Sequence, residues 1–267
     1  MPATAVQVFG PVTVDPNFTT TGEKTLLTMN TTLPAGGKNV IIVTYLDTYG
    51  AGYGAGGTYR IKKGATILYE GKFPNEVFMW DTIPPPTLIA IDESPAGNDT
   101  YTFTINITVA GSVTMSVHVQ AIVIKTDDAM YATNTTAVTV NNGQTATVLS
   151  LPTNFPANSK VVVFGVLNAR SSGDTNTLLG AGSIRLKADT TILSSNEFRI
   201  GSYGVYRSIS YTLYWPLLFF HTVSGATTYS IELYNDSGYA YSCYAMLVAF
   251  TVSDGAFLDT GSVALVN

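Results

Sequence analysis

The sequence predicts an all-β protein with two tandem jelly-roll-like β-sandwich domains that arose from an internal duplication. The main observation is that Arg60–Leu68 and Arg185–Leu193 align without a gap. Each stretch consists of a charged segment, two turn residues and an apolar segment, which is typical of a tight hairpin. The turn residues are Gly64-Ala65 in the first stretch and Asp189-Thr190 in the second. Polar and apolar residues alternate in most other segments, which indicates strands rather than helices.

The same order of segments recurs in both halves of the chain. Val40–Val43 corresponds to Val161–Phe164, and Tyr101 corresponds to Tyr229. The distance in sequence between partners grows slowly, as expected where only loops have changed length. We therefore predict a first sandwich with an N-terminal arm (1–126), a second sandwich (127–252) and a strand-like C-terminal tail (253–267).

The first half is expected to contain eight strands besides its opening segment. That segment, Val6–Val14, contains Gly10-Pro11 and is expected to be an edge strand or an arm, because proline cannot donate a ladder hydrogen bond. Thr100–Val109 alternates between apolar and polar residues, so Val109 is expected inside and Thr104 outside. The other expected strands are Glu23–Met29, Asn39–Asp47, Thr58–Lys63, Thr66–Glu70, Glu76–Trp80, Thr87–Ile91 and Ser112–Lys125. Eight strands with long crossovers suit a jelly roll.

Two strands in each half are apolar on both faces. They are Val40–Val43 and Val119–Ile124 in the first half, and Val161–Phe164 and Met246–Val252 in the second. Such strands must be covered on both sides. One cover is the core of the sandwich, and the other is the sister domain, a loop or another subunit. The linker Thr126–Ala129 is short, which predicts that the two sandwiches are in fixed contact.

The composition is unusually poor in charge. Hydrophobic residues make up 46% of the chain and charged residues only 12%, about half the ~25% of an ordinary soluble domain. The polar surface is supplied by Thr, Ser, Asn, Gly and 16 Tyr, and such a neutral surface favours close packing against other copies. The net charge of −5 argues against nucleic acid as a partner, because phosphate binding needs a basic stripe. No apolar run reaches the ~18 residues of a membrane helix.

The candidate chemical motifs are weak. Gly52–Gly57 matches G-x-G-x-x-G, but dinucleotide binding needs a following helix, and a strand is expected there instead. His118 and His221 are not equivalent in the two halves, and no G-x-S-x-G elbow accompanies them. Cys243 lies in an apolar strand and is expected to be a buried, inert thiol. We therefore expect no enzyme, no cofactor and no metal, with a calcium ion in a loop as the alternative left open.

Two sets of residues are candidates for surface roles. Six sequons could carry glycans, at Asn17, Asn30, Asn98, Asn106, Asn134 and Asn235. Clustered aromatic residues could form an interface with another chain or with the sister domain, since Tyr gives a large contact area at low entropic cost. These residues are Tyr203, Tyr206, Tyr211, Tyr214 and Trp215.

The tail is expected to be the opening strand of a third copy whose sandwich is absent. Asp254–Leu258 corresponds to Asp127–Tyr131, and Val263–Val266 corresponds to Ala137–Val140. A strand without its own sheet must pair with an available edge. It could pair with the second sandwich or add to the sheet of a neighbouring subunit, and Phe257, Val263 and Leu265 would then lie at the interface.

The duplicated stretches and the Thr/Ser/Asn/Gly/Tyr composition resemble those of the jelly-roll structural proteins of icosahedral viruses that infect hyperthermophilic archaea. The resemblance spans the whole chain and implies a non-enzymatic turret, spike, penton or capsid component that self-assembles. Double-jelly-roll capsid proteins are usually longer and carry tower loops, so a turret or spike is preferred. The implied partners are further copies, other virion structural proteins and surface glycans.

Two other functions stay open at this point. One is an extracellular filament or pilus subunit joined by strand exchange, and the other is a carbohydrate-binding sandwich. The start of the chain, Met1–Thr4, has neither the basic nor the apolar region of a signal peptide. We therefore expect a virion protein assembled in the host cytoplasm, or a cell-surface protein if a leader was removed.

Overall fold

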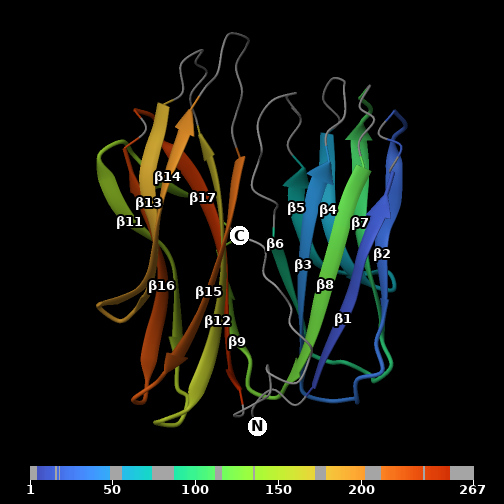
Figure 1. Cartoon of the computed structure of the whole chain (residues 1–267), viewed down its shortest axis with the longest axis horizontal. Helices are drawn as coiled ribbons and strands as arrows, with labels where there is room; N and C mark the ends of the chain where they lie inside the picture. The colour runs from blue at the N-terminus through green and yellow to red at the C-terminus, as the bar shows by residue number, and fades with distance from the viewer. Residues whose placement is uncertain are drawn as a thin grey trace.

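The computed structural model describes residues 5–15, 17, 19–48, 56–73, 87–111, 116–134, 136–171, 179–201, 212–236 and 238–252. This part of the chain forms 17 strands and no helix. The strands make four antiparallel sheets, which face each other in pairs as two sandwiches standing side by side (Figure 1). The prediction of an all-β fold with jelly-roll-like sandwiches is confirmed.

The first sandwich contains eight strands. They are β1 (Ala5–Val14), β2 (Gly22–Asn30), β3 (Lys38–Thr48), β4 (Gly56–Lys63), β5 (Thr66–Phe73), β6 (Thr87–Asp92), β7 (Thr100–Val109) and β8 (Ser116–Thr126). One sheet has the order β1-β8-β3-β6 and the other has the order β2-β7-β4-β5. The first and last strands, β1 and β8, are neighbours in one sheet. Successive strands alternate between the two sheets except at the β4–β5 hairpin, and this connectivity is typical of a jelly roll.

The second sandwich repeats this strand order. Its strands are β9 (Met130–Thr133), β10 (Val138–Val140), β11 (Gln144–Thr153), β12 (Lys160–Ser171), β13 (Leu179–Ala188), β14 (Thr191–Gly201), β15 (Thr212–Thr222), β16 (Thr227–Asn235) and β17 (Tyr241–Val252). The sheets have the orders β10-β17-β12-β15 and β11-β16-β13-β14, and β9 also pairs with β17. The opening strand of the first sandwich is therefore replaced in the second by two short strands.

The two matching hairpins have the predicted geometry. Lys63 pairs with Thr66 and Ala188 pairs with Thr191, so each turn has two residues. The first turn residue has a positive φ in both cases, 56° at Gly64 and 51° at Asp189. A register shift follows at the same place in each hairpin, between Ile61 and Lys62 and between Leu186 and Lys187. Shared irregularities of this kind support the duplication, because bulges are specific local features of a strand pair.

Three details of the first sandwich differ from, or extend, the predictions. The opening strand β1 pairs with β8 at the edge of a sheet, which corresponds to the edge-strand alternative. Val109 was expected inside but is 54% exposed, because β7 ends there. Thr104 was expected outside but is buried, with 3% exposure. The hydroxyl of Thr104 donates to Glu23 Oε1, which covers it. The expected strand Glu76–Trp80 lies outside the described residues.

The strands with two apolar faces lie where the two sandwiches meet. Val162 and Val166 on β12, and Val248 and Phe250 on β17, are buried in the hydrophobic cluster of the first sandwich rather than in that of their own. The alternate side chains of β12, such as Val161 and Val163, belong to the core of the second sandwich. The outer face of each of these strands is therefore covered by the other sandwich. Of the three expected covers (the sister domain, a loop or another subunit), the structure shows the sister domain.

One part of the internal alignment is wrong by one residue. Asn39 bonds Tyr101 on the opposing sheet and so points into the first sandwich, which turns its neighbour Val40 outward. Val161 points into the second core. The true partner of Val161 in the duplication is therefore Asn39 and not Val40.

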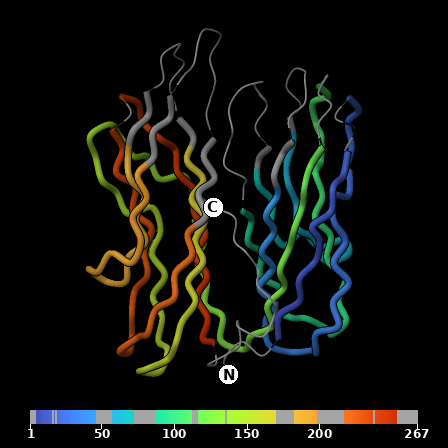
Figure 2. The backbone as a smooth tube through the Cα atoms, viewed as in Figure 1, coloured from blue at the N-terminus to red at the C-terminus, as the bar shows by residue number. Residues whose placement is uncertain are grey.

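The linker is held at both of its ends. The backbone passes from the first sandwich to the second at one end of the molecule (Figure 2). There the carboxylate of Asp128 accepts hydrogen bonds from Thr126 and from the backbone and side chain of Thr251. Lys38 donates to the carbonyl group of Ala129 at 3.0 Å. These bonds tie the linker to β3 and β17.

Candidate functional site

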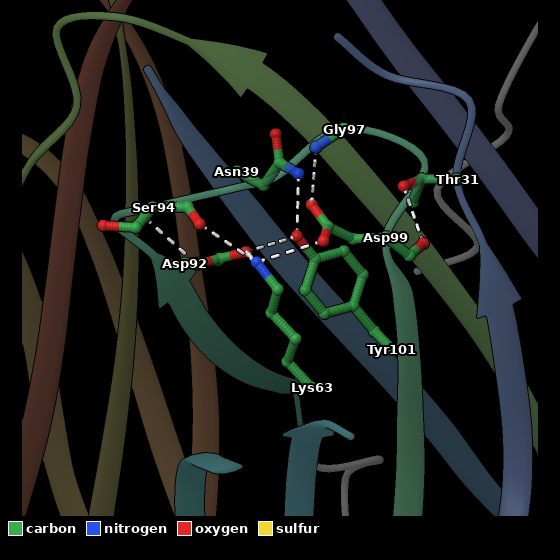
Figure 3. A network of polar contacts seen from close by, with 8 residues as sticks. All are labelled: Thr31, Asn39, Lys63, Asp92, Ser94, Gly97, Asp99 and Tyr101. Carbon is green, nitrogen blue, oxygen red and sulfur yellow. Dashed lines mark hydrogen bonds and ion pairs between the residues drawn. The ribbon is translucent and has the colours of Figure 1, made fainter. Parts of the chain in front are cut away.

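A buried polar cluster lies between the two sheets of the first sandwich, at the end next to the linker. Its centre is Asp92 at the end of β6, which is 5% exposed. Asp92 Oδ2 accepts bonds from Lys63 Nζ and from the hydroxyl of Tyr101, both at 2.7 Å, and Oδ1 accepts from the backbone of Ser94 (Figure 3). A carboxylate in this position is fully bonded although it is out of water.

Asp99 is the second carboxylate of the cluster. Its Oδ1 lies 3.1 Å from Lys63 Nζ, and its Oδ2 accepts from the backbone of Gly97. The carbonyl group of Asp99 accepts from both the backbone and the side chain of Thr31, which fixes the start of β7 to the end of β2 (Figure 3). Lys63 thus bridges two buried carboxylates, so one positive charge is shared between two negative ones.

The bonds of the cluster shift the pKa values of its members. Burial opposes the charged form of Asp92, but the bonds from Lys63, Tyr101 and Ser94 outweigh it and lower the pKa of Asp92. Burial also opposes the charged form of Lys63, and the bonds to Asp92 and Asp99 outweigh it and raise the pKa of Lys63. Burial, together with the bond to Asp92, raises the pKa of Tyr101. At neutral pH Asp92 and Lys63 are therefore charged, and Tyr101 is a neutral phenol.

Two further residues complete the cluster. Asn39 on β3 lies opposite Lys125 of β8 on one side and opposite Asp92 of β6 on the other. The amide nitrogen of Asn39 donates to the hydroxyl of Tyr101 at 2.8 Å. Among the described residues, Asn39 Oδ1 and Lys125 Nζ have no hydrogen-bond partner, although Asn39 is 0% and Lys125 is 3% exposed. Unbonded polar atoms in such places are rare and require an explanation.

The histidines lie apart from this cluster and from each other. His118 Nδ1 lies 2.8 Å from the hydroxyl of Thr13 on the neighbouring edge strand β1. His221 Nδ1 lies 3.1 Å from the hydroxyl of Tyr229, and the two rings meet edge to face. Neither contact joins a nucleophile, a base and an orienting group.

Five of the six predicted sequon residues have side chains that reach the surface. Asn17, Asn30 and Asn98 are exposed, and Asn106 and Asn134 are half-buried. Of these, Asn17 accepts two bonds from Thr19 within its own sequon. Glycosylation at these five positions stays a prediction.

The side chains of Asn134 and Asn235 hold backbone groups in place. The side chain of Asn134 donates to two carbonyl groups and accepts from the backbone of Ala245. Asn235 is 0% exposed and donates to the carbonyl groups of Val140 and Tyr239. A glycan on Asn235 would displace both bonds inside the sandwich, so we withdraw Asn235 from the candidates.

The predicted interface residues are not placed by the structure. Tyr203, Tyr206, Tyr211, Phe257, Val263 and Leu265 lie outside the described residues, and of Tyr214 and Trp215 only the backbone, in β15, is described. The single Cys243 is buried as predicted, and burial raises the pKa of its thiol to about 12. Within the described ranges no group of three or more His, Cys, Asp or Glu side chains could hold a metal ion. No described helix is long and apolar enough to cross a membrane.

Sequence reasoning missed the polar cluster. Its members come from five different strands or strand ends, and no two of the charged ones are adjacent in the sequence. One signal was available: Lys63 ends a hairpin strand whose counterpart in the other half, Ala188, is uncharged. Both positions point into a sandwich, but only Lys63 is charged. A charged side chain at such a position indicates that a partner of opposite charge is buried nearby.

No known protein family and no curated protein matches this sequence. Among solved structures, PNGase F, a glycosylasparaginase from Flavobacterium meningosepticum, is similar with a TM-score of 0.42 and 10% identity over 92% of this chain and 97% of that one. The VP2 subviral particle of infectious bursal disease virus is similar with a TM-score of 0.30 and 11% identity, over 96% of this chain and 73% of that one. The delta-endotoxin Cry8Ea1 from Bacillus thuringiensis is similar with a TM-score of 0.32 and 11% identity, over 81% of this chain and 42% of that one. Likenesses this weak include an enzyme, a capsid protein and a toxin, so they do not distinguish between functions.

Proposed function

We propose that this chain is a non-enzymatic structural subunit of a virus particle, built into a turret, spike or vertex by self-assembly. The observation that carries the proposal is the way in which the two jelly rolls are joined. They bury the outer faces of their β3 and β12 sheets against each other, and the short linker is bonded to both. The result would be one rigid building block that meets other copies through its remaining sheet faces and edges.

The surface composition supports the same function. Only 12% of the residues are charged, so few charges must lose water when copies pack closely. The resemblance to the tandem jelly-roll proteins of icosahedral archaeal viruses adds the turret or spike position to the proposal. Other virion proteins would then surround the subunit, and glycans on Asn17, Asn30 or Asn98 would face outward.

The test is the assembly state of the purified full-length chain. Sedimentation velocity over a range of concentrations, followed by electron microscopy of the fractions, should show closed oligomers of defined symmetry. Open filaments would support the pilus alternative instead. A monomer at every concentration would overturn self-assembly, and a glycan array would then test the carbohydrate-binding alternative.

A further inference from the structure

Lys125, Asn39 and Asp92 form a row across three neighbouring strands of the first sandwich. The ladder places Asn39 of β3 directly between Lys125 of β8 and Asp92 of β6. Asn39 and Asp92 both bond the hydroxyl of Tyr101 on the opposing sheet, so they point into the sandwich. Directly opposite residues on antiparallel strands point to the same face, so Lys125 also points inward.

The amine and the amide of this row are the unsatisfied groups of the cluster. Lys125 Nζ and Asn39 Oδ1 lack partners among the described residues, and both side chains are at least nine-tenths buried. A buried amine without a partner is costly, and so is a buried carbonyl oxygen without a donor. Asp92 and Asp99 are paired with Lys63. Asp127 Oδ1 lies near the amine, because both approach the same point beside Gly37, but it makes no hydrogen bond with it.

The amine also lies at the correct end of the strand. Lys125 Nζ is 3.3 Å from the point where a Cβ atom on Gly37 would lie, which places it beside the turn two residues before Asn39. The Cβ atoms of directly opposite residues are about 4.5–5.5 Å apart, and a lysine side chain can fold across that distance.

We propose that Lys125 and Asn39 condense to form an intramolecular isopeptide bond that links β8 to β3. In this reaction Nζ of Lys125 attacks Cγ of Asn39 with its lone pair and forms a C–N bond. The bond from Cγ to Nδ2 breaks, and Nδ2 leaves as ammonia. One proton is lost from the lysine nitrogen and one is gained by the leaving nitrogen, so the reaction needs no oxidant, metal or other reactant.

Tyr101 and Asp92 are placed to move that proton. The hydroxyl of Tyr101 lies 2.8 Å from the leaving nitrogen and 2.7 Å from Asp92 Oδ2. When the amide becomes tetrahedral, Nδ2 gains a lone pair and can accept the proton of Tyr101, while the proton from lysine returns to the pair of Tyr101 and Asp92. The burial of Asn39 and Lys125 keeps bulk water from the amide and so limits competing hydrolysis.

The bond would change the mechanical character of the first sandwich. It would cross-link two strands that are far apart in the sequence but central in one sheet, and so restrict the unfolded chain as a disulfide does. A chain whose only cysteine is Cys243 cannot use a disulfide for this purpose. In the second sandwich the equivalent positions are Val161, Thr251 and His221, which cannot react in this way, so it is an internal control.

Intact mass spectrometry of the folded, then denatured, full-length protein tests the proposal. We expect a mass lower than that of the sequence by one ammonia, and a tryptic peptide in which the segments around Asn39 and Lys125 are joined. Asn39→Ala and Lys125→Arg should both have the full mass of their sequence. Lys38→Arg, which changes the lysine next to Asn39 in the same strand, should keep the loss.

Two results would overturn the proposal. One is a wild-type protein of full mass that trypsin cleaves normally after Lys125. The other is a loss of ammonia that maps to a succinimide, for which Asn142-Gly143 is the obvious site, rather than to a joined peptide. Both results are measured on the wild-type protein, so they do not depend on whether a variant folds.

Discussion

Tyr101 and Tyr229 occupy the same place in the two sandwiches, but their hydroxyl groups meet different partners. Tyr101 lies between Asn39 and Asp92, in a cluster that also holds two lysines. The hydroxyl of Tyr229 makes a hydrogen bond with the half-buried ring of His221 and with no other described side chain. Burial raises the pKa of Tyr229 to about 12. Both tyrosines are 0% exposed.

The comparison shows that the jelly roll does not need the polar cluster. The positions of Asn39, Lys63 and Lys125 are taken by Val161, Ala188 and Thr251 in the second sandwich, which has the same strand order and the same hairpin bulge. Buried charges are retained at a cost in desolvation, so their presence in one copy alone indicates a specific use. The isopeptide bond proposed above would be such a use.

The largest expected effect concerns the contact through which the two sandwiches depend on each other. Phe250 belongs to β17 but is buried in the cluster of the first sandwich, so Phe250→Ala should lower the free energy of unfolding by about 3–5 kcal/mol. Because the lost contact joins both sandwiches, we expect one cooperative transition at a lower urea concentration. Ile192→Ala, at a position that is 50% exposed in the same sandwich, should change stability by less than about 0.5 kcal/mol. Two separate transitions in the wild type would contradict the coupling.

The next effect compares the partners of the two tyrosines. Asp92→Asn removes the charge that Lys63 and Tyr101 bond, and should cost about 2–3 kcal/mol. His221→Ala removes one bond of a half-buried ring and should cost about 1 kcal/mol. Urea unfolding of both variants measures the difference. Equal losses would mean that the polar cluster adds nothing beyond a single tyrosine contact.

Much of the fold could be predicted from the sequence, because local signals agree with the global pattern. The ungapped match of Arg60–Leu68 with Arg185–Leu193 predicted both hairpins, and alternation predicted most strands. The alignment failed by one residue at Val40, since a strand that is apolar on both faces has no alternation to fix its register. The polar cluster could not be predicted, because Lys63, Asp92 and Lys125 meet only through the sheet order.

A smaller effect is the pH dependence of the cluster. The pKa of Asp92 in the folded protein is below its ordinary value, so its charge contributes stability above the unfolded pKa of about 3.9, and this contribution is lost as the pH falls through the folded value. The difference in stability between wild type and Asp92→Asn should therefore be largest at about pH 6 and shrink at about pH 3. Glu23, whose pKa is also lowered, is present in both proteins and cancels in the difference. A difference that stays constant with pH would assign the cost to packing instead of charge.

The smallest effect lies in the two hairpin turns, which share a backbone shape but not a residue type. Gly64 and Asp189 both have a positive φ, and no atom lies within 4 Å of a Cβ on Gly64, so a substitution there costs only backbone strain. Gly64→Ala should cost about 1 kcal/mol, and Gly64→Asp less, because aspartate tolerates this conformation better than alanine. Asp189→Gly should be nearly neutral, since relief of the strain offsets the loss of the bond from the Thr228 backbone at 2.9 Å. Thermal unfolding can rank the three variants, and a Gly64→Asp protein less stable than Gly64→Ala would show that the two turns are not interchangeable.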